Sequence, residues 1–224
     1  MSIGAEPNPS PTERNTMSAQ PPGHGAILEA ARAEFAERGY AAATIRNIAQ
    51  RAGLSLSALY YYYRSKHEVL VALLEDGLAA YTEACEQALA KAGSGAADRL
   101  DALVEATVRF RATHPAKSTI GRTERRSLDP EHQQAYRDHE VRGTERFRAI
   151  IEQGIADGQF RTPYPDEARR TIIAMCNAIA EWFDPDGGVS LDEVVERYVA
   201  IAFTVVEYRP RRARRGDRTV PGIG

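Results

Sequence analysis

Cysteine is scarce in this chain of 224 residues, which contains only Cys85 and Cys176. The two cysteines lie far apart in apolar, helix-patterned segments, so we expect neither a disulfide framework nor a metal site built on cysteine pairs. Long apolar runs are lacking as well, since no segment approaches the roughly 20 continuous apolar residues of a membrane span. The residues before His24 lack the apolar stretch of a signal peptide. These absences predict a cytoplasmic protein.

Motifs of catalysis are also missing. The sequence has no glycine-rich phosphate loop and no nucleophile elbow. His132 and His139 do not have the i, i+4 spacing with which two imidazoles on one helix share a metal, so we expect them to be surface histidines. The sequence therefore predicts no catalytic residue, no metal site and no cofactor. A small helical enzyme remains as an alternative.

Both ends of the chain have little that could build a core. Residues 1–23 carry five prolines among serine, threonine, asparagine and glycine, and residues 209–224 carry six arginines with two prolines. Such compositions are typical of disordered segments, so we expect a disordered tail at each end. The basic tail is either simply solvated or, alternatively, makes weak, sequence-independent contacts to phosphates at low salt.

Between the tails, apolar residues recur at spacings of three and four, which predicts helices and no sheet. The predicted fold is all-α, with a three-helix domain over residues 24–70 and a second domain of about six helices over residues 71–208. In the second domain, after one long helix, further helices are expected over about residues 98–114, 130–155, 166–183 and 190–208.

Several helix ends are marked by individual residues. Gly39 and Gly53 are expected to end the first two helices, because glycine readily adopts the left-handed conformation found after a helix. Ser65 and Glu68 form a capping box that begins the long helix, and a similar box is expected at the start of the last helix. Asp129, followed by proline, is expected to cap the helix that runs to about residue 155.

The joint between the second and third helices has the composition of a helix-turn-helix. Ala49 and Ala52 are small enough for two helices to cross closely, and Gly53 permits the backbone of a tight turn. The third helix can then project into a DNA major groove, which is about 12 Å wide. Residues 44–67 also contain four positive side chains and no acidic one. This charge pattern suits a polyanion, so we predict a DNA-binding domain, although a solvated face would also explain it.

The third helix is expected to have one buried face and one exposed face. Leu54 and Leu59 would anchor the buried face. The outward residues are the candidates for contacts in the groove: Ser55, Leu56, Ser57, Ala58 and Tyr61. In this arrangement Leu56 would touch thymine methyl groups.

Other side chains are expected to bind phosphates and so to position the domain without reading sequence. Thr44 lies at the start of the second helix, and Lys66 lies at the start of the fourth. Tyr60 and Tyr61 add hydroxyl groups. Tyr60 and Tyr61 are expected to point outward because four successive helical residues cannot all point inward. The neighbouring tyrosines at positions 62 and 63 are expected to pack in the core.

The residues of this domain resemble the signature of TetR-family repressors in order and spacing. The resemblance spans residues 24–70 and is carried by Gly39-Tyr40, Thr44-Ile45, Ile48-Ala49, Ala52-Gly53-Leu54-Ser55, Leu59-Tyr60, Tyr62-Tyr63 and Ser65-Lys66. By position, it implies DNA contacts at Thr44, Arg46, Ser55, Ser57, Tyr60, Tyr61 and Lys66. Leu56 and Ala58 depart from the family, which more often has polar side chains there, and position 63 is usually Phe.

The last two predicted helices are apolar on more than one face. The segment 172–183 and the segment 199–206 are the most apolar parts of these helices. A helix of this kind must be covered on more than one side, which predicts a subunit interface. The resemblance implies the same, because TetR-type repressors dimerise through their last two helices and read palindromic operators. A monomer whose core contains both helices is the alternative.

Beyond the first domain, the chain resembles the fatty-acid and steroid catabolism repressors that respond to acyl-CoA thioesters. The resemblance lies in residues 124–131, 154–160, 182–188 and 198–201, although Asp184 stands where those relatives often have a basic residue. An acyl chain requires an apolar tunnel, and a phosphorylated carrier requires arginines at its mouth. The candidate effector-binding residues are Phe110, Arg122, Arg125, Arg126, Tyr136, Phe147, Met175, Ile179 and Trp182. Each aromatic could instead pack in a core, and the arginines could form a solvated face.

The sequence thus predicts a homodimeric, ligand-responsive regulator of transcription, expected from the family to be a repressor. Its partners would be double-stranded operator DNA, a second copy of the chain and a small-molecule effector, with no membrane involved. An adaptor that keeps the fold without binding DNA is a further alternative, which the acid-free stretch over residues 44–67 disfavours.

Overall fold

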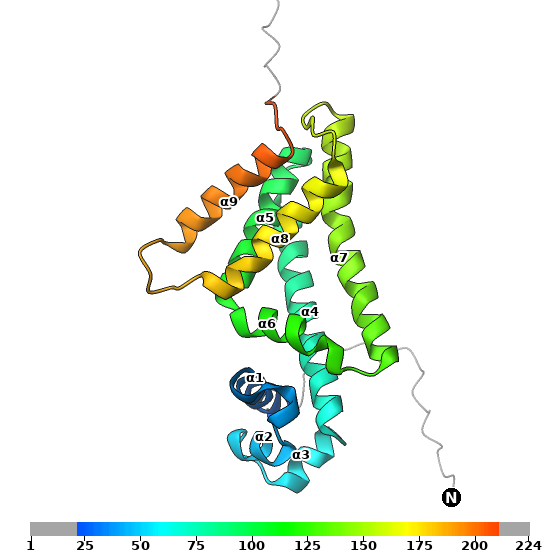
Figure 1. The fold of residues 1–224 in the computed structure, drawn as a ribbon, viewed down its shortest axis with the longest axis vertical. Coiled ribbons are helices and arrows are strands. Elements are labelled where there is room, and N and C mark those ends of the chain that lie inside the picture. Colours follow the sequence, from blue (N-terminus) through cyan, green and yellow to red (C-terminus); the bar gives the residue numbers. More distant parts are fainter. Residues whose placement is uncertain (1–21, 211–224) are drawn as a thin grey trace, which may run out of the picture.

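The structure, a computed structural model, describes residues 22–210. Within this range the chain is all-α, with nine α-helices, one 3₁₀ turn and no strand (Figure 1). The helices are α1 (Pro22–Ala42), α2 (Ile45–Arg51), α3 (Leu56–Tyr62), α4 (Lys66–Lys91), α5 (Ala96–Thr113), α6 (Pro115–Glu124), α7 (Pro130–Ala156), α8 (Pro165–Trp182) and α9 (Leu191–Val205). The predicted fold class is therefore confirmed. The two predicted tails lie outside the described residues except at their inner ends, where α1 already begins at Pro22.

Local hydrogen bonds define the starts of the second and third helices. Thr44 Oγ1 accepts a hydrogen bond from the amide of Asn47 at 3.1 Å and caps α2, and Ser55 Oγ caps α3 in the same way. Gly53 has a φ of 69°, the left-handed conformation that the tight turn requires. The second and third helices are therefore joined as the sequence predicts.

Two helix ends differ from their predicted positions. The first helix continues past Gly39, where the backbone leaves helical geometry with φ 71° and ψ 159°, and regains a further turn that ends at Ala42. The last helix ends at Val205, and Glu207 has a φ of 52°. A glycine with positive φ can kink a helix as well as end it, which the sequence does not distinguish.

The helix α6 has no counterpart among the predicted elements. The predicted helix over about residues 98–114 stops before Pro115, and no further helix was expected until residue 130. In the structure Pro115 occupies the first turn of α6. Proline is tolerated there because the amide it lacks would have no partner in the first turn of a helix. The same residue that ends α5 therefore begins α6, and the short 3₁₀ turn η2 (Arg125–Ser127) leads on to α7.

Two hydrophobic cores are present, and α4 belongs to both. Val69, Leu70, Leu73 and Leu74 pack in the core of the first domain, whereas Cys85 packs in that of the second. The first core is completed by residues from further along the chain, namely Ile120 of α6 and Leu128. The predicted domain division at residue 70 remains a prediction, since α4 crosses it without a break.

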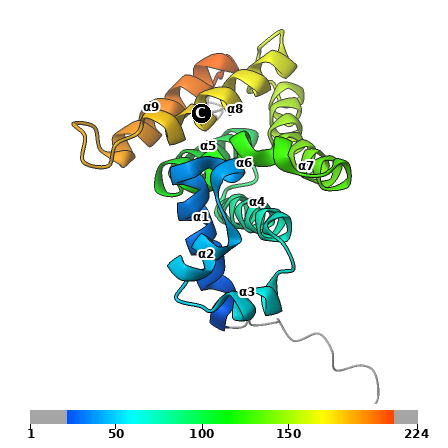
Figure 2. The ribbon, with the colours of Figure 1, turned by 60° about the horizontal axis from the view of Figure 1, so that its bottom comes forward.

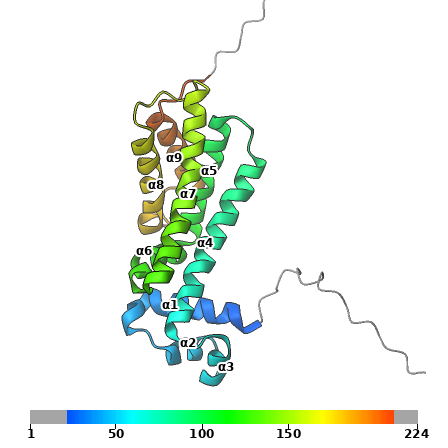
Figure 3. The ribbon, with the colours of Figure 1, turned by 90° about the vertical axis from the view of Figure 1, so that its right-hand side faces the viewer.

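The arrangement of the helices places the small domain at one end of the molecule. Figures 1 and 3 show α1, α2 and α3 below the long bundle, with α6 lying between α1 and the other helices. Figure 2 shows α8 and α9 together on one side of the bundle. Within residues 22–210 no helix is both long and apolar enough to cross a membrane.

Candidate functional site

The short helix α3 is anchored on one side and open on the other. Leu59 is fully buried, whereas the side chains of Ser55 and Ser57 are exposed and their hydroxyls lie 3.0 Å apart. Leu54 and Leu56 are half-buried and pack against the first core. Leu56 is therefore less free to face a groove than the sequence pattern predicts.

Burial separates the four consecutive tyrosines. Tyr60 is 46% exposed and Tyr61 is 85% exposed. Tyr63 is buried, and its hydroxyl lies 2.6 Å from Nε2 of His24. Burial, together with the charges of Asp76 and Glu75, raises the pKa of Tyr63 to about 12. Two phenol groups are thus available at the surface, and the other two pack inward or partly inward.

The positive side chains of residues 44–67 differ in what they contact. Arg51 is held by Glu37, at 2.8 Å from Nη1 to Oε1, and by the buried Glu34. This pairing fixes α2 against α1. Among the described residues, the guanidinium groups of Arg46 and Arg64 have no acidic partner. These two charges remain available to a polyanion.

Lys66 serves the fold of the small domain. Its Nζ donates hydrogen bonds to the carbonyl oxygens of Tyr40 at 2.7 Å and Ala43 at 2.8 Å. It also lies 4.4 Å from the centroid of the Tyr40 ring. A cation at the carbonyl end of a helix is favourable, so Lys66 holds the end of α1 against the start of α4.

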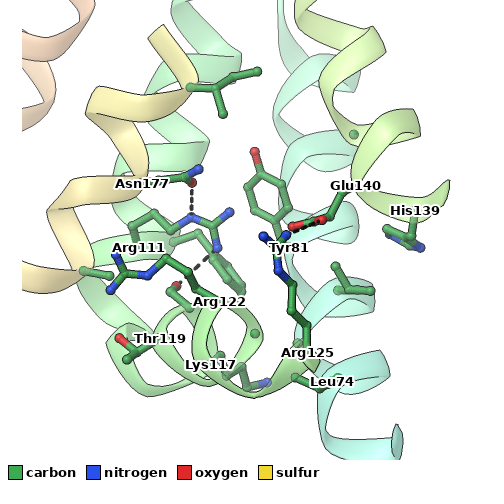
Figure 4. Close-up of a pocket in the computed structure, with 18 of the residues that line it drawn as sticks. Leu74, Tyr81, Arg111, Lys117, Thr119, Arg122, Arg125, His139, Glu140 and Asn177 are labelled. Atoms are coloured by element: carbon green, nitrogen blue, oxygen red, sulfur yellow. Dashed lines mark hydrogen bonds and ion pairs between the residues drawn. The ribbon is translucent and has the colours of Figure 1, made fainter. Parts of the chain in front are cut away.

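A cavity of about 170 Å³ lies among α4, α5, α6, α7 and α8 (Figure 4). Five of the predicted effector-binding residues line it, and they come from α5, α6, α7 and the 3₁₀ turn η2. They are Phe110, Arg122, Arg125, Tyr136 and Phe147. The cavity is small beside the roughly 300–1,000 Å³ of typical ligand pockets, so a large ligand would have to extend beyond it or part the helices.

Several polar groups of the cavity were not predicted. Tyr81, Arg111, His139, Glu140 and Asn177 all contribute to its wall (Figure 4). They come from four helices and share no sequence motif, so only their meeting in space identifies them. The sequence offers one weak indication of them: each is a polar side chain on a helix that also has an apolar face.

Arg111 contacts residues of three other helices. Its guanidinium donates to Oδ1 of Asn177 at 3.0 Å and to Oγ of Ser118 at 3.2 Å. It also lies 4.5 Å from the centroid of the Tyr81 ring. One side chain thus joins α5 to α4, α6 and α8 across the cavity.

The charge of the cavity wall is positive overall. The wall has four permanent cations, Arg111, Lys117, Arg122 and Arg125, and two carboxylates, Glu140 and Glu181. Arg122 pairs with Glu181, and Arg125 pairs with Glu140 at 3.0 Å. The two exposed glutamates therefore orient Arg122 and Arg125 through ion pairs that contribute little free energy. An anionic ligand could replace the glutamates at these arginines.

The tyrosine at position 136 is neutral at physiological pH. Burial and, to a lesser degree, the charge of Glu140 raise the pKa of Tyr136 to about 12. Its hydroxyl lies close to Gly121, where a Cβ atom would come within 2.6 Å of it. The absence of a side chain at Gly121 therefore makes room for this phenol between α6 and α7.

Beside the cavity, the positive surface continues. Two shallow hollows are lined by Arg122, Arg125, Arg126 and Arg137, together with Thr123, Gln133 and Tyr136. Arg126 lines both hollows but not the cavity itself. Arg125 lines the cavity and both hollows. The cavity is therefore continuous with the arginine-rich surface beside it.

Three predicted effector residues lie elsewhere. Ile179 is fully buried in the second core, and Met175 packs against that core. Trp182 is 50% exposed and stacks on Tyr198 of α9. These three side chains contribute to the packing of α8 and to its outer face, and the structure does not bring them into the cavity.

A chain of ion pairs runs from the cavity to the small domain. Lys117 of α6 lines the cavity, and its Nζ lies 2.9 Å from Oδ2 of Asp76 on α4. The same oxygen accepts a hydrogen bond at 2.9 Å from Arg32, a buried residue of α1. The cavity floor and the first helix thus share one carboxylate.

Comparisons with known proteins cover both domains. Residues 27–73 match the family described as "Bacterial regulatory proteins, tetR family", and residues 93–206 match "Tetracyclin repressor-like, C-terminal domain". The HTH-type transcriptional repressor KstR2 of Mycobacterium tuberculosis is 30% identical over 179 residues, which are 79% of this chain and 89% of that protein.

Solved structures are similar along nearly their whole length. A bacterial regulatory protein in the tetR family from Rhodococcus RHA1 is 30% identical with a TM-score of 0.78, over 85% of this chain and 100% of that one. The ketosteroid transcriptional regulator KstR2 of Mycobacterium tuberculosis is 27% identical with a TM-score of 0.74, over 84% of this chain and 95% of that one.

Proposed function

Because this chain belongs to the TetR family of bacterial transcription regulators, we propose that it binds a palindromic operator as a homodimer and is released by an acyl-CoA thioester. The cavity that opens onto a row of arginines is the observation that carries the choice of effector. In this role the protein represses transcription and has no catalytic activity of its own.

The helix α3 would read the operator. Ser55, Ser57 and Tyr61 are its exposed polar residues, and they would reach base edges or the neighbouring backbone. Tyr60 and the capping residue Thr44 would bind phosphates on either side, together with Arg46, which lies in the first turn of α2. Lys66 would act through the fold, because its ammonium group already binds the end of α1.

Two copies would associate through α8 and α9. Each of these helices exposes a large apolar side chain, Trp182 on α8 and Ile201 on α9. Figure 2 shows the two helices side by side at the surface of the bundle. A two-fold axis through this face would present two α3 helices to successive major grooves, about 34 Å apart.

The effector would divide between the cavity and the surface beside it. Its acyl group would occupy the cavity among Phe110, Tyr136 and Phe147, where apolar contacts are available. Its phosphates would lie over Arg125 and Arg126, whose guanidinium groups can bind phosphate oxygens in a bidentate manner. The ligand is larger than a cavity of about 170 Å³, so its binding would separate the surrounding helices.

The response to the effector would pass through α6. This helix lines the cavity on one side and contributes Ile120 to the core of the small domain on the other. A displacement of α6 would therefore move α1 and change the spacing of the two α3 helices. A ligand that prefers the displaced state must weaken operator binding. By linkage, the bound operator weakens ligand binding by the same factor.

The test is a titration of the full-length protein on DNA from its own promoter, at defined salt, with and without acyl-CoA. The panel would contain free CoA, short-chain and long-chain acyl-CoAs and a steroid-derived acyl-CoA, the last because KstR2 is named a ketosteroid regulator. We expect one acyl-CoA to raise the melting temperature and to release the DNA. Free CoA should do neither.

Variants connect this result to the cavity. Arg125→Ala and Arg126→Ala should each weaken acyl-CoA binding about tenfold by calorimetry, the loss expected for one charge-assisted contact. Arg170→Ala is the matched control, because within residues 22–210 this exposed arginine of α8 pairs only with Glu167, outside the cavity. Equal ligand affinity for free and operator-bound protein would contradict the proposal.

A further inference from the structure

Two histidines and one aspartate from distant parts of the sequence meet at the junction of the two domains. His67 lies in the first turn of α4, Asp129 caps α7 and His132 lies in the first turn of α7. One ligand atom from each can be chosen so that all three lie within 4.8 Å of one another. Among residues 22–210 it is the only group of three or more His, Cys, Asp or Glu residues that meets this criterion.

The individual contacts show how the three side chains are oriented. Nδ1 of His132 lies 2.8 Å from Oδ1 of Asp129, and Nε2 of His67 lies 3.7 Å from Oδ2 of the same carboxylate. The backbone amide of Asp129 donates to Nε2 of His67 at 3.2 Å, so the lone pair of this nitrogen is directed at the aspartate. The two imidazole rings lie 5.5 Å apart in an edge-to-face arrangement.

These groups are the ligands that a zinc ion prefers. Zinc is bound by neutral imidazole nitrogen and by carboxylate oxygen at about 2.0–2.2 Å, so its tetrahedral ligand atoms lie about 3.4 Å apart. The chosen ligand atoms of the three residues now lie within 4.8 Å of one another. Rotations of the side chains can bring them to the spacing that the ion requires. All three side chains are partly exposed, so an ion and a water ligand can reach them.

We propose that His67, Asp129 and His132 form a Zn²⁺ site that ties the start of α4 to the start of α7. The ion would bind Nε2 of His67, Nδ1 of His132 and one oxygen of Asp129, with water as the fourth ligand. At Nε2 of His67 it would replace the hydrogen bond from the backbone amide of Asp129, which water can then accept. Binding at Nδ1 leaves the proton of a neutral His132 on Nε2. The backbone amide of His132 would still be bound by Oδ1 of Asp129, at its present 2.9 Å, so the cap of α7 is preserved.

The proposed site lies where the small domain meets α7. α4 follows α3 directly, and His132 is one turn before Tyr136, which lines the cavity. A bound ion would therefore fix the small domain against the helix that forms one wall of the cavity. This inference rests on the cluster itself and stands whether or not an acyl-CoA is the effector.

The test is calorimetric titration of metal-free, full-length protein with Zn²⁺ alone. We expect one high-affinity ion per chain and a higher melting temperature in its presence. His67→Gln and His132→Gln should each weaken this binding at least about tenfold and abolish the rise in melting temperature. Mg²⁺, which prefers oxygen ligands, should not compete.

His139→Gln is the matched control, because this histidine lies on the same helix and bonds to Thr82 at 3.0 Å, outside the cluster. It should bind Zn²⁺ as the unaltered protein does. Circular dichroism would establish that each variant is folded, and the two single variants provide independent tests. Unchanged Zn²⁺ affinity in both folded variants, or no saturable binding to the unaltered chain, would overturn the proposal.

Discussion

At positions 60–63 four tyrosines follow one another, and burial decides what each can do. The hydroxyl of Tyr61 is open to solvent on an 85% exposed side chain, whereas that of Tyr63 is bonded to His24 inside the small domain. The same phenol can therefore serve binding at one position and stability two positions later.

The role of Tyr61 can be measured by removing its hydroxyl alone. Tyr61→Phe should weaken operator binding about fivefold to tenfold, the loss of one hydrogen bond of about 1–1.5 kcal/mol, with the melting temperature unchanged. Fluorescence anisotropy with labelled operator would measure the affinity. Tyr63→Phe is the control, since it should lower stability by about 1 kcal/mol through the lost bond to His24. Unaltered operator affinity in Tyr61→Phe would show that this hydroxyl does not contact DNA.

At the scale of elements, α6 is the helix through which the two halves of the molecule communicate. It faces the cavity with Lys117 and Arg122 and the small domain with Ile120. Asp76 of α4 joins it to α1, because its carboxylate binds Lys117 and the buried Arg32 together. A movement of α6 must therefore either carry α1 with it or break one of these ion pairs.

Neutralising this carboxylate should uncouple the two halves. Asp76→Asn should lower the free energy of unfolding by about 1–3 kcal/mol, because Arg32 is buried and loses a charged partner. It should also reduce the effect of acyl-CoA on operator affinity. Urea denaturation and operator titrations with and without ligand would measure both.

The matched control for Asp76→Asn is Glu152→Gln, which removes an exposed ion pair to Arg148 within α7. Such a pair contributes little, so stability should change by less than about 0.5 kcal/mol and the ligand response should be intact. If Asp76→Asn responds to ligand as fully as this control, then coupling does not pass through the shared carboxylate.

At the largest scale, the assembly of two copies is proposed to depend on apolar side chains that α8 and α9 expose. Trp182 and Ile201 lie on α8 and α9 and are 50% and 47% exposed. Tyr198, stacked on Trp182, extends this apolar surface along α9. Val141 of α7 is 56% exposed but lies on another helix, and so provides a comparison of similar exposure.

A charge on the proposed interface should give a monomer. Ile201→Glu would place a carboxylate where two copies meet, and burying it without a partner is costly. Light scattering after size exclusion should show half the mass of the unaltered protein, and operator affinity should fall at least a hundredfold because one half-site is lost. Val141→Glu should remain dimeric. A dimer in both variants would place the interface elsewhere.

Much of the fold can be predicted from short-range pattern. Spacings of three and four predict helices, and the caps at Thr44, Ser55, Ser65 and Asp129 form as the local residue types indicate. The two predicted capping boxes form only in part. Ser65 and Ser190 cap their helices, but Glu68 accepts a hydrogen bond from the amide of Arg64, and Glu193 pairs with Arg197. The helix α6 was missed because a proline that ends one helix can also begin the next.

Local residue patterns were enough to specify an all-α chain with a helix-turn-helix near its start, because helical periodicity, caps and tight turns depend on residues within a few positions of one another. Which side chains share a cavity, which cations already have partners and that His67 lies beside His132 became known from the packing of the helices. Those groups are brought together by the packing of helices far apart in the chain, and the contacts that choose among possible packings are not written in any local pattern.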